Sequence, residues 1–532
     1  MDCTATRIPY RQTNAFSMIA LDYIDQAAAL KPFYAHPPSL QGIQKAITSR
    51  KPFPVNRKVL VEELKKQYRT VNPGKKVAEN IEALLSENTF TVTTAHQNNI
   101  FTGPLYFIYK IIHAIRLADH LNDSLEGNRF VPVFYIGSED ADLEELNHIY
   151  LDGEKLSWQT GQTGAVGRMT IDKDLLKLVD RIEGRLGVLP HGGDIVSLIR
   201  DCYREGRTIQ DATFLFVHAL FAEYGLVVLV PDNAALKTQV TAIFEDDLLR
   251  QAASGIVEET TSRLQSGGYK VQAHPREINL FYLTDNSRER LVEKNGAYVV
   301  LNSQVKFTRE QLLEELRAHP ERFSPNVILR GLYQESILPN IAFIGGAGET
   351  AYWLQLKDLF DHYAVPFPVL VLRNSFLLVE KKWREKMTKL GFRSEDFFLP
   401  GDELMNLLVK RESRNETRLN GSLGELEQLY DSFRTQAVKV DATLEKHVEA
   451  LKSRTVQRLQ ELEKKMLRAE KRKYSDQQRQ LHAIREALFP GNGLQERTQN
   501  FSYYYALYGP SFIRSLYEQA LTLEQEFVIL EL

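Results

Sequence analysis

Several segments of the chain place chemically active side chains directly after β-like apolar runs. The first extends from His96 to Tyr106 and joins His96 and Gln97 to a Thr102-Gly103-Pro104 turn. A helix follows this turn, and the backbone N–H groups that open a helix attract phosphate or carboxylate. The segment therefore predicts an anion-binding turn, although a polar turn that only caps the helix explains these residues equally well.

The second segment, residues 138–148, carries five carboxylates and a histidine after a continuous apolar run. On a helix, Glu144 and His148 would share a face. Such a cluster could hold Mg²⁺, bind an amine or act as a general base. An acidic helix start favoured by the helix dipole is the alternative. The position after a core strand favours a function for Glu139, Asp140 and His148.

The third segment combines Gln334–Asn340 with Ile344–Trp353, where glycines follow a β-like run. Glycines allow a backbone to approach a ligand closely. Neither G-x-G-x-x-G nor G-x-x-x-x-G-K-[ST] occurs, so a dinucleotide fingerprint and a P-loop are not predicted. The alternative is a glycine turn that leads into a packed helix. Of the residues in this segment, Glu349 is the one that this alternative explains least well.

Two further segments could contribute to the same site. Arg373-Asn374-Ser375 ends the Val369–Leu372 run, and polar residues there would lie at the same sheet edge as the other segments. Residues 494–500, which contain Gln495 and Arg497, could clamp a base or a phosphate, or could only seal an interface. For both segments, a purely structural role explains the residues about as well as a role in binding.

The elements that would position these residues indicate an α/β fold with a largely parallel sheet. Helical patterns alternate with β-like runs, which are Thr89–Thr94, Val131–Ile136, Leu226–Val230, Val327–Leu329, Ile341–Ile344 and Val369–Leu372. Residues near 150–330 contain extra material that we interpret as insertions around the sheet.

Past Phe376 the pattern becomes helical. Leu377–Leu390 is expected to form a helix. Glu425–Phe489 contains no Gly or Pro, and its apolar residues recur in steps of three and four among dense charges. This pattern is typical of a coiled coil. The apolar stripe thins across Lys471–Gln480, so we expect two or three helices folded as a hairpin with a break there.

Composition excludes several classes of protein. The chain has 532 residues, 66 Lys and Arg against 69 Asp and Glu, and two cysteines, Cys3 and Cys202. Nucleic-acid coating needs a basic surface, and a disulfide framework or a cysteine-rich zinc site needs more cysteines. No apolar run approaches the ~18 residues of a membrane span, and no secretory signal opens the chain. We expect a cytoplasmic protein without nucleic-acid or membrane partners.

Six motifs in the chain, which include several of these segments, occur in an order that resembles the bacillithiol biosynthesis cysteine-adding enzymes, the BshC family. The matching residues are His96-Gln97 with Thr102–Tyr106 and Tyr109-Lys110; Glu139-Asp140 with Glu145, Asn147 and His148; Gly161-Gln162 with Val166–Arg168; Glu335–Asn340; Gly345–Trp353; and Leu488–Pro490 with Leu494–Arg497. The resemblance implies a Rossmann-like core with inserted connecting segments over residues 1–376. It also implies a homodimerising helical coiled-coil domain over 377–490 and a C-terminal segment, 491–532, that returns to the core.

The family's reaction adds cysteine to the amine of glucosaminyl-malate, and its members are associated with adenine nucleotides. We therefore expect a ligase that uses ATP or ADP with Mg²⁺, without a protein-bound metal. The expected catalytic residues are His96, Glu139, Asp140 and His148. The expected substrate- or nucleotide-binding residues are Gln97, Asn98, Thr102, Gly103, Tyr106, Lys110, Asn147, Arg168, Glu335, Ser336, Asn340, Gly345, Gly346, Gly348, Glu349, Arg373, Asn374, Ser375, Gln495 and Arg497. Within this set, Arg168 and Arg373 are expected to hold the malate carboxylates. A dimeric nucleotide-binding scaffold and an adenylating ligase for another amino acid or amine are the alternatives.

Overall fold

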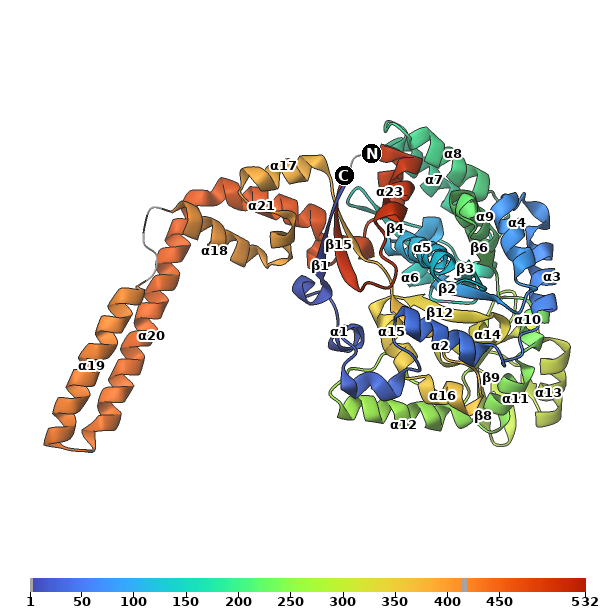
Figure 1. Cartoon of the computed structure of the whole chain (residues 1–532), viewed down its shortest axis with the longest axis horizontal. Coiled ribbons are helices and arrows are strands. Elements are labelled where there is room, and N and C mark those ends of the chain that lie inside the picture. Colours follow the sequence, from blue (N-terminus) through green and yellow to red (C-terminus); the bar gives the residue numbers. More distant parts are fainter. Residues whose placement is uncertain (1–2, 414, 416–418) are drawn as a thin grey trace. The chain divides into compact units, whose positions relative to one another are not determined.

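The computed structural model describes residues 3–413, 415 and 419–532, which divide into two compact units (Figure 1). Unit 1 comprises Met1–Leu377 and Gly493–Leu530, and unit 2 comprises Leu378–Asn492 and Glu531–Leu532. The segment 493–530 therefore belongs with the first 377 residues, although more than a hundred residues of unit 2 separate them along the chain.

The centre of unit 1 is a five-stranded sheet in which all neighbouring strands are parallel. Its strands are β2 (Thr89–Gln97), β3 (Arg129–Gly137), β6 (Val227–Leu229), β12 (Asn340–Gly345) and β13 (Val369–Leu372). They lie in the order β13-β12-β2-β3-β6. Numbered along the chain, this is the 3-2-1-4-5 order of a Rossmann-like sheet, which confirms the predicted α/β fold.

Buried runs explain why these strands are central, continuous and apolar in β3 and rich in threonine in β2. In β3 every residue from Phe130 to Ile136 is buried. β2 pairs with β3 along its whole length, from Thr89 opposite Arg129 to Gln97 opposite Gly137. Strands covered on both faces need such runs, because neither face meets water.

Helices bury the faces of this sheet. α5 (Tyr106–Ser124) packs against β2 and β3, and α2 (Leu40–Arg50) packs against β12 and β13. Ile43 of α2 and Leu117 of α5 join Phe90 and Val371 in one buried core. Each such side chain contributes about 1.5–3 kcal/mol when it leaves water.

The other elements of unit 1 surround this core. Before β2 lie β1 (Thr4–Pro9), α1 (Met18–Ile24), α3 (Arg57–Gln67) and α4 (Gly74–Ala83). Between β3 and β6 lie α6 (Leu143–Leu146), β4 (His148–Leu151), β5 (Glu154–Ser157), α7 (Lys173–Leu186), α8 (Gly192–Cys202) and α9 (Ile209–Phe221). Between β6 and β12 lie α10 (Ala234–Thr238), α11 (Thr241–Leu249), α12 (Ala252–Ser266), α13 (Arg309–Ala318) and α14 (Val327–Ile337). Between β12 and β13 lie α15 (Ala347–Leu354) and α16 (Lys357–His362), and the returning segment forms α22 (Phe501–Tyr508), α23 (Pro510–Gln519) and β15 (Glu526–Glu531).

A second five-stranded sheet is inserted between β6 and β12. It is antiparallel, with the order β10-β9-β8-β7-β11. Its strands are β7 (Leu280–Leu283), β8 (Arg288–Lys294), β9 (Ala297–Val300), β10 (Lys306–Phe307) and β11 (Phe323–Pro325). Asn295 and Gly296, both with positive φ, form the tight turn between β8 and β9. This sheet lies within the region where the sequence predicts insertions.

Two predicted elements are wrong. Val327–Leu329 is not a strand but the first turn of α14, because the Asn326 side chain accepts from the backbone N–H groups of Ile328 and Leu329 and caps a helix. Leu377–Leu390 is not one helix. Its beginning belongs to the buried strand β14 (Phe376–Val379), in the sheet β1-β15-β14, and a helix starts only at Lys381.

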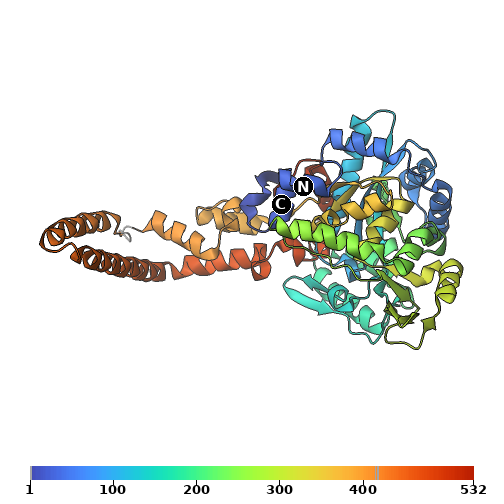
Figure 2. The ribbon, with the colours of Figure 1, turned by 90° about the horizontal axis from the view of Figure 1, so that it is seen from below.

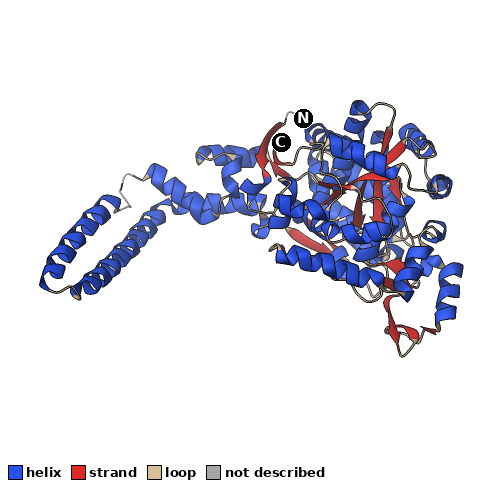
Figure 3. Cartoon of the chain, turned by 60° about the horizontal axis from the view of Figure 1, so that its bottom comes forward, coloured by secondary structure: helices blue, strands red, loops and turns tan. Residues whose placement is uncertain are grey.

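Unit 2 is almost entirely helical (Figure 3). Its helices are α17 (Lys381–Lys389), α18 (Gly401–Glu412), α19 (Asn420–Val440), α20 (Leu444–Lys471) and α21 (Ser475–Leu488). α19 and α20 lie side by side as an antiparallel hairpin (Figures 1 and 2). The predicted hairpin is thereby confirmed, and the predicted break falls at residues 472–474, between α20 and α21.

Polar pairs join the two arms of the hairpin. The hydroxyl groups of Tyr430 and Thr455 lie 2.8 Å apart, and Lys452 pairs with Asp431 at 3.1 Å. Several apolar side chains of α19 and α20 nevertheless remain in solvent, among them Leu429, Phe433, Leu451 and Leu462, each at least 40% exposed. The hairpin therefore leaves apolar surface uncovered.

Candidate active site

A pocket of about 520 Å³ opens where the order of the parallel strands reverses, between β2 and β12. Open α/β sheets bind ligands in the crevice outside the carboxyl ends of their strands at this point. Residues at or after the ends of all five strands line the pocket. These are His96 and Gln97, Glu139 and Asp140, Pro231, Gly346–Glu349, and Arg373. The pocket lies within unit 1.

His96 forms part of the pocket wall at the end of β2. Its ring meets the edges of Tyr106 and Phe107, with centroids 5.2 and 5.4 Å apart. Burial, followed by the charges of Lys110 and Arg373, holds the pKa of His96 well below its usual range. The imidazole is therefore neutral near pH 7, and its Nε2 has no hydrogen-bond partner among the described residues. It can donate or accept one hydrogen bond from a ligand.

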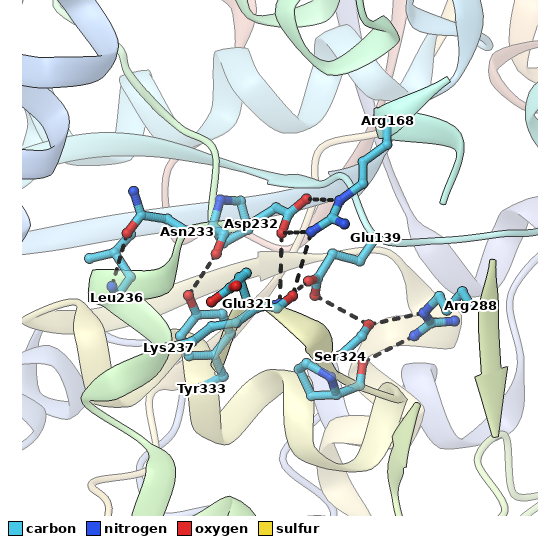
Figure 4. A network of polar contacts seen from close by, with 12 residues as sticks. Glu139, Arg168, Asp232, Asn233, Leu236, Lys237, Arg288, Glu321, Ser324 and Tyr333 are labelled. Atoms are coloured by element: carbon cyan, nitrogen blue, oxygen red, sulfur yellow. Dashed lines mark hydrogen bonds and ion pairs between the residues drawn. The ribbon is translucent and has the colours of Figure 1, made fainter. Parts of the chain in front are cut away.

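Glu139, directly after β3, belongs to a buried polar network (Figure 4). Lys237 of α10, which has no exposed surface, pairs with Glu139 and lies 3.7 Å from Asp232. Arg168 holds Asp232 by two hydrogen bonds of 2.7 and 2.8 Å. Burial raises the pKa of Glu139, and Lys237 offsets part of that rise. Glu139 thus borders the pocket with a counter-ion behind it.

Asp140 and Glu145 extend this acidic side of the pocket. Gln97 donates from Nε2 to Asp140 at 2.8 Å, which joins the ends of β2 and β3. Burial, together with the negative charges of Asp142 and Asp140, raises the pKa of Glu145. Carboxylates in this arrangement can bind an ammonium group or accept a proton from one.

The opposite side of the pocket is cationic. Lys110 of α5 donates to the carbonyl of Ala95 at 2.9 Å and pairs with Glu349. Glu349 also accepts from the backbone N–H of Gly346 at 2.8 Å, which caps α15. Arg373 pairs with Glu496 at 2.7 Å, and its guanidinium lies 5.1 Å from the centroid of Tyr106. Positive charge and a glycine-containing helix start therefore meet on this wall.

Sequence reasoning missed two arginines of the pocket, Arg288 and Arg330. Arg288 belongs to the inserted sheet and donates to the Ser324 hydroxyl at 2.9 Å. Arg330 lies on α14, in the turn before the Gln334–Asn340 motif, and donates to Tyr352 at 2.7 Å. If Val327–Leu329 had been predicted as helical, Arg330 would have fallen on the same helix face as Gln334 of the predicted motif. That spacing is the sequence signal that could have identified Arg330.

Eleven of the predicted site residues line the pocket. They are His96, Gln97, Tyr106, Lys110, Glu139, Asp140, Gly346, Gly348, Glu349, Arg373 and Arg497. Thirteen do not line it. They are Asn98, Thr102, Gly103, Asn147, His148, Arg168, Glu335, Ser336, Asn340, Gly345, Asn374, Ser375 and Gln495. The structure gives several of this second group partners within the fold.

Glu335 and Asn340 support the sheet rather than the pocket wall. Arg50 of α2 pairs with Glu335 at 2.6 Å, and both side chains are buried. Asn340 donates to Glu335 at 2.7 Å and accepts from Thr93 at 2.8 Å. The cluster therefore ties α2 and α14 to the central strands.

His148 and Arg168 differ from the expectations for them. α6 ends at Leu146 and His148 opens β4, so Glu144 and His148 do not share a helix face. His148 Nδ1 lies 3.2 Å from the amide oxygen of its neighbour Asn147. The guanidinium of Arg168 is held by Asp232, and Arg168 does not line the pocket.

The turn between β2 and α5 is held from the far end of the chain. Phe101, Thr102 and Gly103 all have positive φ, and a Cβ on Gly103 would lie 2.7 Å from Asn99 Cβ. Asn500 donates to the carbonyl of Phe101 at 2.9 Å and also to that of Gly103. These contacts fix a strained turn next to the pocket.

Together these features describe a Rossmann-like protein with a small-molecule pocket at the sheet reversal and a helical hairpin in a second unit. Residues 1–374 match the family "Bacillithiol biosynthesis BshC, N-terminal Rossmann-like domain", and residues 376–532 match "Bacillithiol biosynthesis BshC, C-terminal coiled-coil domain". The chain belongs to the BshC family.

Relatives from several bacteria share its whole length. A protein of Cytophaga hutchinsonii named "Putative cysteine ligase BshC" is 39% identical, over 93% of this chain and 92% of its own. Proteins of the same name from Flavobacterium psychrophilum and Flavobacterium johnsoniae are each 38% identical, over 98% of this chain and 99% of theirs.

Proposed function

We propose that this protein is a cysteine ligase that joins the carboxyl group of L-cysteine to the amine of glucosaminyl-malate and so completes bacillithiol. The names of the relatives support this reaction. The observation that carries the proposal is the pocket itself, in which acidic and cationic side chains line one cavity at the Rossmann switch point. Such a site can hold an amine and an activated carboxyl group together.

A carboxylate is a poor electrophile and has to be activated before an amine attacks it. ATP, when bound, supplies the phosphoryl or adenylyl group that activates it. Two features fit phosphate oxygens, namely the unpartnered Nε2 of His96 and the start of α15, where a Cβ on Gly348 would meet no other atom within 4 Å. Lys110 and Arg373 stabilise the negative charge that develops there. In this proposal Mg²⁺ enters the site bound to the nucleotide.

On the acidic side, Glu139 and Asp140 receive the ammonium groups of the substrates. The ammonium group of the sugar first loses one proton to solvent, because only the neutral amine has a lone pair with which to attack. When this amine attacks the activated carbonyl carbon, the new C–N bond forms as the bond to the activating group breaks. The amine then gives up one proton, and Asp140 is placed to accept it.

The reaction is tested with the purified full-length protein, L-cysteine, glucosaminyl-malate and Mg-ATP. We expect a product with the mass of bacillithiol, together with consumption of ATP. His96→Ala and Asp140→Ala should each lower kcat/KM about 100-fold, because each removes a contact to the reacting groups. Full activity in both variants would favour a scaffold, and preference for a competing amino acid would favour a different ligase.

We propose in addition that the hairpin of α19 and α20 joins two copies of the chain. Its exposed apolar side chains, including Leu429 and Leu462, need a partner surface. Light scattering after size-exclusion chromatography should give twice the chain mass. Leu429→Lys combined with Leu462→Lys should give one chain mass, whereas Gln428→Lys, at an exposed polar position, should not. A wild-type monomer at every concentration would contradict this proposal.

None of the described helices combines the length and the apolar character that crossing a membrane requires. A cytoplasmic location stays a prediction from the sequence.

A further inference from the structure

The cationic side of the pocket carries more positive than negative charge. After burial, the largest cause, the charges of Arg373 and Arg330 also lower the pKa of Lys110, so the three cations lie near one another. Lys110 pairs with Glu349, and Arg373 pairs with Glu496. Arg330 has no carboxylate of the described residues within ion-pair distance. Arg330 therefore shares the negative charge of Glu349 with Lys110 and has no ion pair of its own on this wall.

This imbalance is unusual within the molecule. The most buried cationic side chains are Arg50, Lys110, Lys237 and Arg373, and each pairs with a glutamate. Pairing is expected because a charge that leaves water without a partner costs several kcal/mol. Two arginines that border the pocket and are only partly exposed, Arg330 and Arg288, have no such ion pair among the described residues, and Arg330 is the one that lies near Lys110.

The guanidinium of Arg330 is also held in place. It donates to the Gln334 side chain at 3.1 Å and to the Tyr352 hydroxyl at 2.7 Å. The rings of Tyr135 and Phe343 each have their centroid 5.8 Å from it. A guanidinium has five N–H donors, and these two contacts use two of them. Three donors are left for a ligand, in the fork geometry that suits carboxylate and phosphate.

We propose that Arg330 is the anchor for one anionic group of a substrate, a carboxylate or a phosphate. The group binds at the guanidinium of Arg330 on the wall that also contains Lys110 and the start of α15. This inference rests on the proposed function and deepens it, because it assigns substrate recognition to a residue outside the motifs that the sequence singles out.

Binding of two simple probes tests the assignment without any turnover. Isothermal titration of the full-length protein with L-malate and, separately, with inorganic pyrophosphate is compared between wild type and Arg330→Gln. We expect Arg330→Gln to weaken binding of at least one probe by about 10- to 100-fold. Loss confined to malate identifies a carboxylate, and loss confined to pyrophosphate identifies a phosphate.

Matched variants distinguish recognition of the anionic probe by Arg330 from a loss of folding and from a general loss of positive charge. Arg276→Gln removes the same charge from an exposed position outside the pocket and should bind both probes like wild type. Arg330→Lys keeps the charge without the fork and should recover part of the affinity. If Arg330→Gln does not fold, Tyr352→Phe, which only releases the guanidinium, should weaken the same probe several-fold.

Unchanged binding of both probes by Arg330→Gln, or no binding of either probe by wild type, would overturn the assignment. Probe binding that depends on Arg330 in a protein that makes no bacillithiol would instead contradict the proposed reaction and leave the anchor in place.

Discussion

Replacement of Lys237 by methionine is expected to destabilise unit 1 by about 3–5 kcal/mol near pH 7. Lys237 has no exposed surface and is the counter-ion of Glu139, whose side chain is itself only 11% exposed. Methionine fills a similar volume but leaves Glu139 without its positive partner. Asp232 keeps Arg168, so the loss falls mainly on Glu139. Urea denaturation followed by the fluorescence of buried Trp158 and Trp353 measures the change.

The stability that Lys237→Met loses relative to wild type should be smaller at lower pH. Burial already raises the pKa of Glu139, and Lys237 is the largest influence that lowers it. Without Lys237 the pKa in the folded state rises further above the value in the unfolded chain. The folded state then binds a proton that the unfolded state releases, so stability falls as the pH rises through the folded-state pKa. The deficit should therefore be smaller at about pH 5.5 than at about pH 8.

Two other substitutions control this experiment. Lys51→Met removes a lysine from an exposed position and should change the free energy of unfolding by no more than about 0.5 kcal/mol. Lys237→Arg keeps the charge and should lose less stability than Lys237→Met. Equal destabilisation by Lys237→Met at both pH values would show that packing, and not the charge of Glu139, is what Lys237 provides.

Lys110→Met should affect catalysis far more than stability. Lys110 is as buried as Lys237, but its partner Glu349 is 23% exposed and can regain water. The structural loss should stay near 1 kcal/mol. In the proposed reaction Lys110 faces the charge that forms on the activated carboxyl group, and removal of one such group costs about 100- to 1,000-fold in kcat. Steady-state kinetics with saturating ATP and cysteine give this value.

The variant Lys110→Arg tests whether the positive charge of Lys110 accounts for its effect on kcat. Arginine retains the charge, so it should recover at least about a tenth of the wild-type kcat. If Lys110→Met leaves kcat within about threefold of wild type while its KM values rise, Lys110 contributes to binding alone. The proposed electrostatic role would then be wrong.

The location of the pocket could be predicted from sequence because parallel strands end at one edge of the sheet. His96, Glu139, Gly346 and Arg373 each come at or just after the end of an apolar run, and the structure brings all four to the same pocket. That argument needs only the strands and their direction, which continuous apolar runs reveal.

What each side chain faces could not be predicted in this way. Glu335 precedes the Ile341–Ile344 run and Glu349 follows it. Only Glu349 lines the pocket, whereas Glu335 pairs with Arg50, which lies 285 residues earlier in the chain. Arg288 reaches the pocket from an inserted sheet, and no local pattern tells where that sheet packs. Arg330 was not predicted as a site residue because the β-like composition of Val327–Leu329 predicted a strand. The side chain of Asn326 caps a helix there instead.

The contacts of Asn500 have a consequence for the order in which the protein can assemble. During synthesis, residues 89–137 and residues 378–492 of unit 2 are made before the segment 493–530. Until that segment emerges, the strained turn at Phe101–Gly103 lacks the amide of Asn500 that donates to its carbonyl groups, and Arg373 lacks Glu496. The nascent chain can therefore build most of its sheet but not a finished pocket. Competence to bind substrates arrives late, with the residues that translation supplies after the hairpin.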